Sequence, residues 1–138
     1  MNESPTLWHS TNRDFQRFDA AEIREAGFHF GTRAQAEMRG GRILIEAKVS
    51  AGRQKRLKDR AFWRSKDLAR YHRAGWDSVI YLNRIEGIPL ARFESMRAIG
   101  LDPDRISDSR FKKLAPEAED SVHVFDPSSI RILKKTRR

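Results

Sequence analysis

The feature of this sequence that most constrains its fold is a series of short apolar segments with the composition of β-strands. Turns and short helical segments lie between them in no regular order. The predicted strands cover residues 6–9, 27–30, 42–49 and 77–85, and two further short strands in residues 121–133 are broken at Asp126 and Pro127. Because strands and helices do not alternate strictly, we predict an α+β fold rather than a doubly wound parallel sheet.

One helix start is marked clearly. Thr32 and Gln35 form the T-x-x-Q pattern of a capping box, and Gly40 or Gly41 is expected to end this helix. Two more predicted helices cover residues 65–75, with Ser65 as the cap, and 90–100, and we expect residues 101–120 to form a long polar loop.

Length and composition narrow the class of protein. The 138 residues fit a single domain, residues 1–138, with a basic C-terminal tail from about residue 134. The absence of cysteine excludes disulfides, thiolate nucleophiles and cysteine-ligated metals, and the scattered histidines do not predict a metal site. No apolar run is long enough to cross a membrane and the N-terminus lacks signal-peptide features, so we expect a soluble cytoplasmic protein with no membrane partner.

The charge balance points to a polyanionic partner. Lysine and arginine number 28 against 19 acidic residues, a formal net charge of +9. A surplus of this size favours nucleic acid, although it also suits an acidic protein partner or simple solubility. The densest basic segment, which carries the predicted nucleic-acid contacts, contains Arg53, Lys55, Arg56, Lys58, Arg60 and Arg64.

Four segments in order resemble a known family. They are LWHSTNRDFQRF (residues 7–18), GFHFGTRAQAEMR (27–39), GWDSVIYLNRIEG (75–87) and DSVHVFDPSSIRIL (120–133). Together they resemble ADP-ribosyltransferases of the diphtheria-toxin and poly(ADP-ribose) polymerase class, most of all the small transferase domains of bacterial toxins and phage polyvalent proteins. The stretch from about residue 89 to 120 has no counterpart in the resemblance.

The resemblance implies the ADP-ribosyltransferase fold, a split and strongly bent β-sheet with short helices around a cleft that holds NAD, the substrate. Breaking the nicotinamide–ribose bond builds positive charge on the sugar, as in glycoside hydrolysis. A site for this reaction must fix the ribose, hold the nicotinamide and leave one face of the sugar open to an acceptor.

His9 matches the first-motif histidine of this class, which hydrogen-bonds ribose hydroxyls. Ser10 and Thr11 stand where the family has Gly-Thr, and all three are predicted to contact NAD. An imidazole can both donate to and accept from a diol. The alternative is a histidine that merely ends a strand.

His29 falls where many members place the tyrosine that stacks on nicotinamide. Strand alternation would send Phe28 and Phe30 into the core and turn His29 toward the cleft. We therefore predict that His29, with Phe30 beside it, cradles nicotinamide or its ribose. The alternative is a surface histidine on a strand whose other face is buried.

Gly31, Thr32 and Arg33 open the helix that follows. The free N–H groups of a helix start and a nearby guanidinium suit the pyrophosphate of NAD. The equal alternative is that Thr32 serves only as a cap and Arg33 is solvated.

The third catalytic position departs from the family pattern. Ser121 stands where many members have a glutamate, and serine cannot act as a carboxylate base. Asp120 is the neighbouring carboxylate, but a shift by one residue would turn its side chain to the other face of the strand. Glu86, after the strand at residues 77–85, is the reserve candidate. The predicted catalytic set is thus His9, His29, and Ser121 or Asp120.

We expect a toxin or phage-effector transferase that passes ADP-ribose to a macromolecule. The basic surface favours RNA, or DNA, as the acceptor, and the alternatives are a protein target and transfer to water. An immunity or antitoxin protein is a further expected partner. A catalytically degenerate nucleic-acid-binding module of the same fold remains the main alternative from another class.

Overall fold

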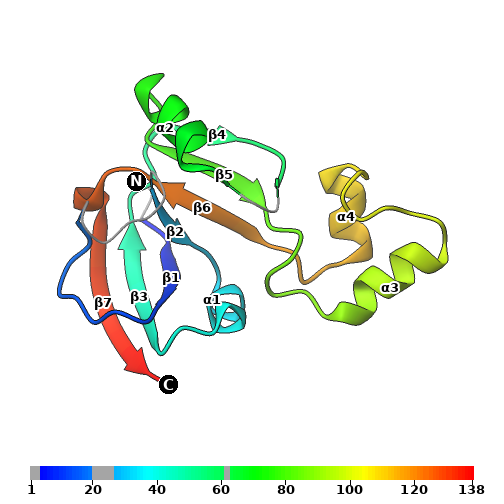
Figure 1. Ribbon diagram of the computed structural model, residues 1–138, viewed down its shortest axis with the longest axis horizontal. Coiled ribbons are helices and arrows are strands. Elements are labelled where there is room, and N and C mark those ends of the chain that lie inside the picture. The colour runs from blue at the N-terminus through cyan, green and yellow to red at the C-terminus, as the bar shows by residue number, and fades with distance from the viewer. Residues whose placement is uncertain (1–3, 20–26, 61–62) are drawn as a thin grey trace.

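The computed structural model describes residues 4–19, 27–60 and 63–138, and it contains two β-sheets with short helices at their ends (Figure 1). The first sheet has the order β1-β3-β7 and is antiparallel, with β1 at Thr6–Thr11, β3 at Ile43–Val49 and β7 at Ile130–Arg137. The second has the order β2-β6-β5-β4, with β2 at Phe28–Phe30, β6 at Asp120–Val124, β5 at Ser78–Leu82 and β4 at Gln54–Arg56. Only β4 and β5 pair in parallel among these strands. The architecture is mixed α+β, as predicted.

The helices lie at the margins of the sheets (Figure 1). They are α1 (Arg33–Arg39), α2 (Ser65–Arg73), α3 (Leu90–Ala98) and α4 (Asp108–Leu114), and a single 3₁₀ turn, η2, covers Pro127–Ser129. Helix α1 packs beside β1, and α2 packs on β5. Helices α3 and α4 extend from the end of β5 and lead the chain back into β6 (Figure 1).

The main core lies between the two sheets. Phe28 and Phe30 of β2 point into it with Ile45 of β3, and Val122 and Val124 of β6 complete the second sheet's contribution. Phe18, from the segment after β1, packs edge-on against Phe28 and at a tilted angle against Phe30. The alternation of β2 therefore buries both phenylalanines on one face, as the sequence predicts.

A second apolar cluster lies between the other face of the second sheet and α2. It joins Leu68 of α2 to Val79 and Tyr81 of β5, with Trp63 and Phe125 at its sides. The second sheet is therefore covered on both faces. As a result, the polar residues that alternate with its core residues are also buried.

Helices α3 and α4 enclose a third cluster around Phe111 and Met96, both of which are almost fully buried. The guanidinium of Arg84, just after β5, is buried beside it and donates to the Asp108 carboxylate at 2.6 Å and to the Pro103 carbonyl at 2.7 Å. A buried cation needs a partner, so these two contacts hold the start of α4 and the segment before it against the end of β5.

One prediction about a loop was wrong. Residues 101–120, expected to be a polar loop, contain α4, which begins after Ser107, whose side chain accepts from the Arg110 N–H. The helix is mostly polar and buries only Phe111, so its pattern carried little apolar periodicity. The predicted basic tail from about residue 134 lies within β7, where Lys134 and Lys135 pair with Glu46 and Ile45 of β3.

Candidate functional site

The two sheets meet where β1 passes the end of β2. Trp8 and Gly31 form an isolated antiparallel bridge, with N–H to O distances of 2.8 and 3.0 Å in the two directions. A Cβ atom at Gly31 would collide with the side-chain oxygen of Gln35 and lie 3.2 Å from the Ser121 hydroxyl. Glycine is therefore required here for space, and this close approach brings three elements to one point.

His29 lies on the face of β2 opposite Phe28 and Phe30, and its side chain is 10% exposed. Arg39 of α1 donates to the ring Nδ1 at 2.8 Å, and the ring Nε2 lies 2.8 Å from the Tyr81 hydroxyl oxygen. Because a guanidinium can only donate, Nδ1 is the acceptor, and the proton of the neutral ring is on Nε2. His29 is thus held between a helix and a strand of the second sheet.

The titration of His29 is shifted strongly. Burial lowers the pKa of His29 well below its ordinary value, and the neighbouring His123 and Arg39 lower it further. Tyr81 is shifted in the opposite direction, since burial raises the pKa of its hydroxyl. Both groups are therefore neutral near pH 7, and both act in this site through hydrogen bonds.

A chain of hydrogen bonds continues from Tyr81 through Ser121. Ser121 is fully buried, and its hydroxyl donates to Gln35 Oε1 and accepts from Asn83 Nδ2, each at 2.9 Å. Tyr81 also hydrogen-bonds Ser121. The hydroxyl of Ser121 therefore connects α1, β5 and β6 and has no open approach from solvent.

Glu86 brings a carboxylate close to His29. Its Oε1 lies 3.9 Å from His29 Nε2, and its Oε2 lies 3.6 Å from Arg39 Nη1. Asn83 holds it in place, because Asn83 Nδ2 donates to Glu86 Oε1 at 2.8 Å and Asn83 Oδ1 accepts from the backbone N–H of Glu86 at 2.8 Å. The Glu86 side chain is 18% exposed, so it is held firmly and can still be reached.

Asp120 does not join this cluster. Its carboxylate forms a two-pronged ion pair with the Arg56 guanidinium, at 3.1 and 2.7 Å. Asp120 and Ser121 are successive residues of β6, so their side chains point to opposite faces of the sheet. Of the three positions considered for the missing family glutamate, only Glu86 brings a carboxylate to His29.

His9 approaches the backbone of His29 from the first sheet, on the core side of β2. Its Nδ1 lies 2.7 Å from the carbonyl oxygen of His29, and since a carbonyl only accepts, Nδ1 donates this bond and Nε2 keeps its lone pair. The ring packs against Phe18 and Phe30, with centroids 5.1 and 5.5 Å away. Burial lowers the pKa of His9, although the bond to His29 partly offsets this effect.

Ser10 and Thr11 are engaged in the turns beside β1. The Ser10 hydroxyl accepts from the Gly41 N–H at 2.7 Å, and the Thr11 hydroxyl accepts from the Arg13 N–H at 3.1 Å. These bonds tie the end of β1 to the segment before β3 and to the turn that follows β1, and they use part of the acceptor capacity that the predicted NAD contacts would need.

The start of α1 has the predicted capping box. The Thr32 hydroxyl accepts from the Gln35 N–H at 3.2 Å, and Gln35 Oε1 accepts from the Thr32 N–H at 3.0 Å. Arg33 is exposed and pairs with Glu37 at 2.8 Å. Gln35 thus caps its helix and also binds Ser121, whereas Arg33 points to solvent and does not approach His29.

His123 of β6 lies directly beside His29 in the register of the second sheet, with ring centroids 4.9 Å apart. It stacks on Tyr81 at 5.8 Å and packs against Trp63 at 5.6 Å. Burial lowers the pKa of His123 to about 3, so this ring is neutral. It forms the buried floor behind His29.

The linear sequence gave weak signals for several residues of this cluster. Arg39, Tyr81, Asn83 and Gln35 were not among the predicted site residues. Gln35 was visible only as a capping residue, and Tyr81 only as a strand position. Their convergence depends on the pairing of β6 with both β2 and β5, which no local pattern specifies.

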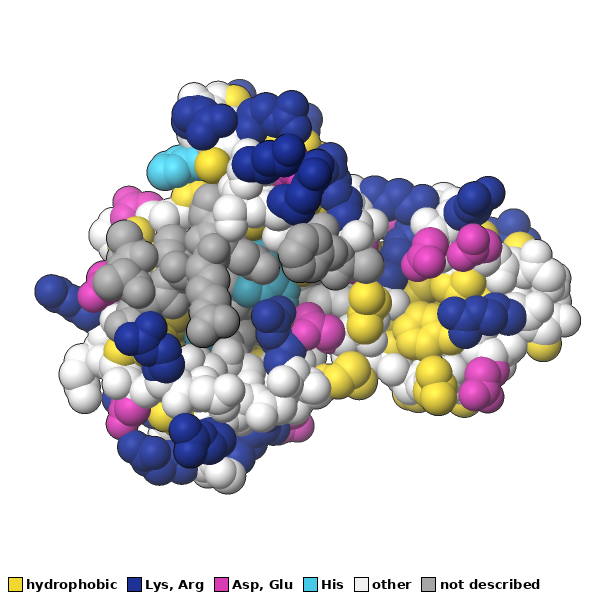
Figure 2. Space-filling model, in the orientation of Figure 1, with side chains coloured by type: hydrophobic (Ala, Val, Ile, Leu, Met, Phe, Trp, Pro, Cys, Tyr) yellow, Lys and Arg dark blue, Asp and Glu magenta, His cyan; other side chains and the backbone are white. Residues whose placement is uncertain are grey.

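The predicted nucleic-acid contacts lie on and beside β4 and α2, where Figure 2 shows lysine and arginine side chains gathered on the upper part of the molecule. Arg53 and Lys55 lie over the Trp76 ring, 4.2 and 5.3 Å from its centroid. The other four make internal contacts: Arg56 with Asp120, Lys58 with the Arg105 carbonyl, and Arg60 and Arg64 with Asp67. Arg53, Lys55 and Lys58 are therefore the cations of this group without an ion pair among the described residues, and Arg53 and Lys55 are the two that lie over an aromatic ring.

Comparisons of the chain with protein-family models, with curated proteins and with solved structures find no match. Among the described residues, no helix is long and apolar enough to cross a membrane.

Proposed function

We propose that this protein is an NAD-dependent ADP-ribosyltransferase of the bacterial-toxin or phage-effector type, with the His29 cluster as its active site. The observation that carries the proposal is the approach of the Glu86 carboxylate to His29. His9, from the other sheet, hydrogen-bonds the backbone carbonyl of His29. Two sheets joined at the Trp8–Gly31 bridge also support the split sheet of the ADP-ribosyltransferase fold.

In the proposed reaction the bond between the nicotinamide nitrogen and ribose C1′ breaks, and its electron pair leaves with nicotinamide, which becomes neutral. The acceptor then forms a bond to C1′ and gives up a proton. Glu86 is the group that takes this proton and stabilises the positive sugar, since its carboxylate is held by Asn83 and Arg39. Glu86 thus takes the role of the glutamate that many family members have at the position of Ser121.

The two histidines have binding roles in this proposal. The free Nε2 lone pair of His9 accepts from a ribose hydroxyl, because its Nδ1 is already committed to the His29 carbonyl. His29 offers the exposed edge of its ring to nicotinamide or its ribose, and its orientation is fixed by Arg39 and Tyr81. Holding the substrate in one geometry is a large part of the catalytic effect expected from such a site.

RNA or DNA is the acceptor that we propose, with RNA favoured. The support is the basic surface of β4 and α2, where Arg53 and Lys55 lie over Trp76 without ion pairs among the described residues. Such cations bind phosphates, and an aromatic ring beside them suits an unstacked base. Modification of a protein target, and control by an inhibitory protein, are the competing assignments for the same surface.

A second candidate is a nucleic-acid-binding module of the same fold that no longer transfers ADP-ribose. The enclosure of Ser121 favours it, because the residue at the family's glutamate position is fully buried and hydrogen-bonded on both sides. The two candidates differ in whether Glu86 supplies the carboxylate function.

Incubation with labelled NAD separates them. The purified protein is mixed with labelled NAD and, separately, with total RNA, DNA or cell protein, and the label and the released nicotinamide are measured. The proposal predicts label in RNA or DNA that His9→Ala removes. Label in protein would assign the basic surface to a protein target. Absence of both label and nicotinamide release would leave the binding module as the function.

A further inference from the structure

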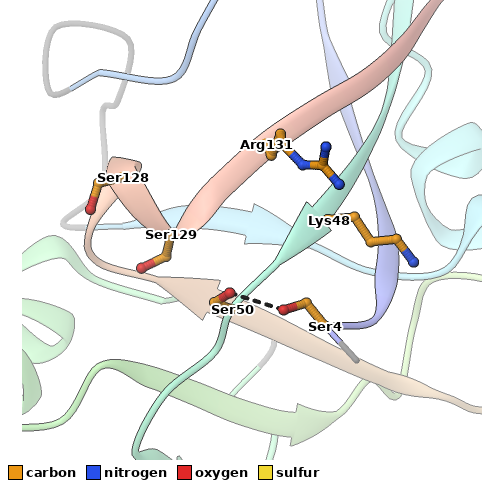
Figure 3. A pocket seen from close by; sticks show the side chains of 6 residues that line it. All are labelled: Ser4, Lys48, Ser50, Ser128, Ser129 and Arg131. Atoms are coloured by element: carbon orange, nitrogen blue, oxygen red, sulfur yellow. Dashed lines mark hydrogen bonds between the residues drawn. The ribbon is translucent and has the colours of Figure 1, made fainter. Parts of the chain in front are cut away.

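A polar cleft of about 400 Å³ lies on the first sheet (Figure 3), and none of its lining residues belongs to the His29 cluster. It opens where β3 ends and where η2 leads into β7. Its lining comes from three segments and consists of Ser4, Lys48, Ser50, Ser128, Ser129 and Arg131. The proposed transfer reaction uses none of these residues.

The two cations of the cleft face each other across neighbouring strands. Lys48 of β3 and Arg131 of β7 are directly paired in the antiparallel register. Their neighbours Val49 and Ile132 pack toward the core, so Lys48 and Arg131 share the outer face of the sheet. Like charges placed opposite each other destabilise a sheet. Within the described part of the chain neither cation forms an ion pair, and the lining contains no carboxylate.

Serine hydroxyls complete the wall of the cleft. The Ser4 and Ser50 hydroxyl oxygens are 3.0 Å apart (Figure 3), and the Ser50 N–H donates to the Ser129 carbonyl at 2.9 Å, which fixes the two segments together. Asp126, the acidic residue at the start of η2, uses its carboxylate to accept from the Ser128 N–H at 2.9 Å. The cleft is therefore rich in donors and positive in charge.

We propose that this cleft binds a phosphate group. Phosphate oxygens accept several hydrogen bonds at once, a guanidinium fits them in a two-pronged geometry, and an ammonium adds a point charge. A bound phosphate would also remove the repulsion between Lys48 and Arg131, which gives a physical reason for keeping two cations in paired positions. Free phosphate, a nucleotide monoester and the phosphodiester of a nucleic acid share this chemistry. This inference does not depend on transfer of ADP-ribose.

Calorimetric titration of the full chain with inorganic phosphate, at ionic strength balanced with sodium chloride, tests the proposal. We expect saturable binding that Arg131→Gln weakens by roughly tenfold or more, because a charge-assisted pair of bonds is lost. Arg110→Gln on the exposed surface of α4 removes the same charge outside the cleft and should bind as the wild type does. Without phosphate, Arg131→Gln should unfold at the same or a higher temperature than the wild type.

Two further arms identify the source of the phosphate. Displacement of inorganic phosphate by a short oligonucleotide with a 5′-hydroxyl end would support the phosphodiester, and displacement only by its 5′-phosphorylated form would support a monoester or free phosphate. Equal phosphate affinity in the wild type and Arg131→Gln would overturn the proposal, as would a response no greater than that to chloride. These titrations do not measure nicotinamide release. A negative result for phosphate binding would therefore not count against the proposed transferase activity.

Discussion

The two faces of the second sheet are built from alternate residues of the same strands, but one face is apolar and the other combines polar side chains with the apolar cluster under α2. One face carries Phe28, Phe30, Val122 and Val124 into the main core, and the other carries His29, His123, Tyr81 and Ser121 into a buried polar cluster. Burying apolar side chains stabilises the fold, whereas burying imidazoles and hydroxyls costs free energy unless each is hydrogen-bonded. The sheet thus uses one face for stability, and we infer that it keeps the other for chemistry.

The largest expected effect is on the apolar face. Phe30 is 0% exposed, so Phe30→Ala should lower the free energy of unfolding by about 3–5 kcal/mol, since it removes the ring and leaves a cavity. Chemical denaturation measures this loss. A loss below about 1 kcal/mol would mean that the interior between the sheets is not packed as described.

On the polar face, Glu86→Gln should leave stability nearly unchanged and lower the rate of nicotinamide release by about a hundredfold, as expected when a positioned carboxylate is lost. The amide keeps the size of the side chain and the bond to Asn83. Single-turnover assays with labelled NAD measure the rate. An unchanged rate would remove Glu86 from the mechanism.

The buried histidines predict that acid destabilises the protein. Burial lowers the pKa values of His9, His29 and His123, so these rings are neutral when folded and take up protons in the unfolded chain below about pH 6.5. Their contribution to stability is therefore complete above that pH and falls as the pH drops, by about 1.4 kcal/mol per pH unit for each ring.

Denaturation curves between pH 7 and 5 measure this slope. His123→Phe should reduce the slope of stability against pH by the contribution of one histidine, since the pKa of His123 is about 3. The phenylalanine ring should fit, because the His123 ring already packs against Tyr81 and Trp63. A slope that the substitution leaves unchanged would mean that His123 is not held neutral by burial.

Tyr81→Phe should have a smaller effect, about 1–2 kcal/mol of lost stability, because it leaves the His29 Nε2 proton without its acceptor. The ring packing against Trp63 is retained. The pKa of His29, followed by NMR, should change in this variant. If neither stability nor this pKa changes, the bond between Tyr81 and His29 does not organise the polar face.

The smallest expected effect is that of Asp120→Asn. Its ion pair with Arg56 is partly exposed, so stability should change by less than about 1 kcal/mol. Nicotinamide release should stay within about twofold of the wild type, since Asp120 faces away from His29. Loss of release comparable to that of Glu86→Gln would assign the carboxylate role to Asp120 instead.

The strand alternation in residues 28–30 predicted correctly which residue of β2 faces away from the core, and Thr32 and Gln35 predicted the capping box. These features depend on neighbours in the chain. Helix α4 was missed because it is short and polar, and β4 because three residues, Gln54–Arg56, become a strand only by pairing with β5.

The candidate site was predictable only in part, because some of its residues lie in local motifs and others are brought together by long-range strand pairing. His9 and His29 could be named from their motifs, but the nearest carboxylate could not. Glu86 reaches His29 because β6 pairs with both β2 and β5, a long-range pairing that leaves one strand between β2 and the end of β5. The choice between Glu86 and Asp120 therefore required the structure, although alternation had already predicted that Asp120 and Ser121 face opposite ways.

The most direct test of the central claim is an NMR titration of the isotope-labelled full chain with NAD, following every backbone amide. The account predicts saturable shifts that are largest at His9, His29, Gly31 and Glu86, where the two sheets meet. Shifts confined to α2 and β4 or to the cleft of Lys48 and Arg131, or no saturable shift at all, would contradict the assignment of the polar face as an NAD site.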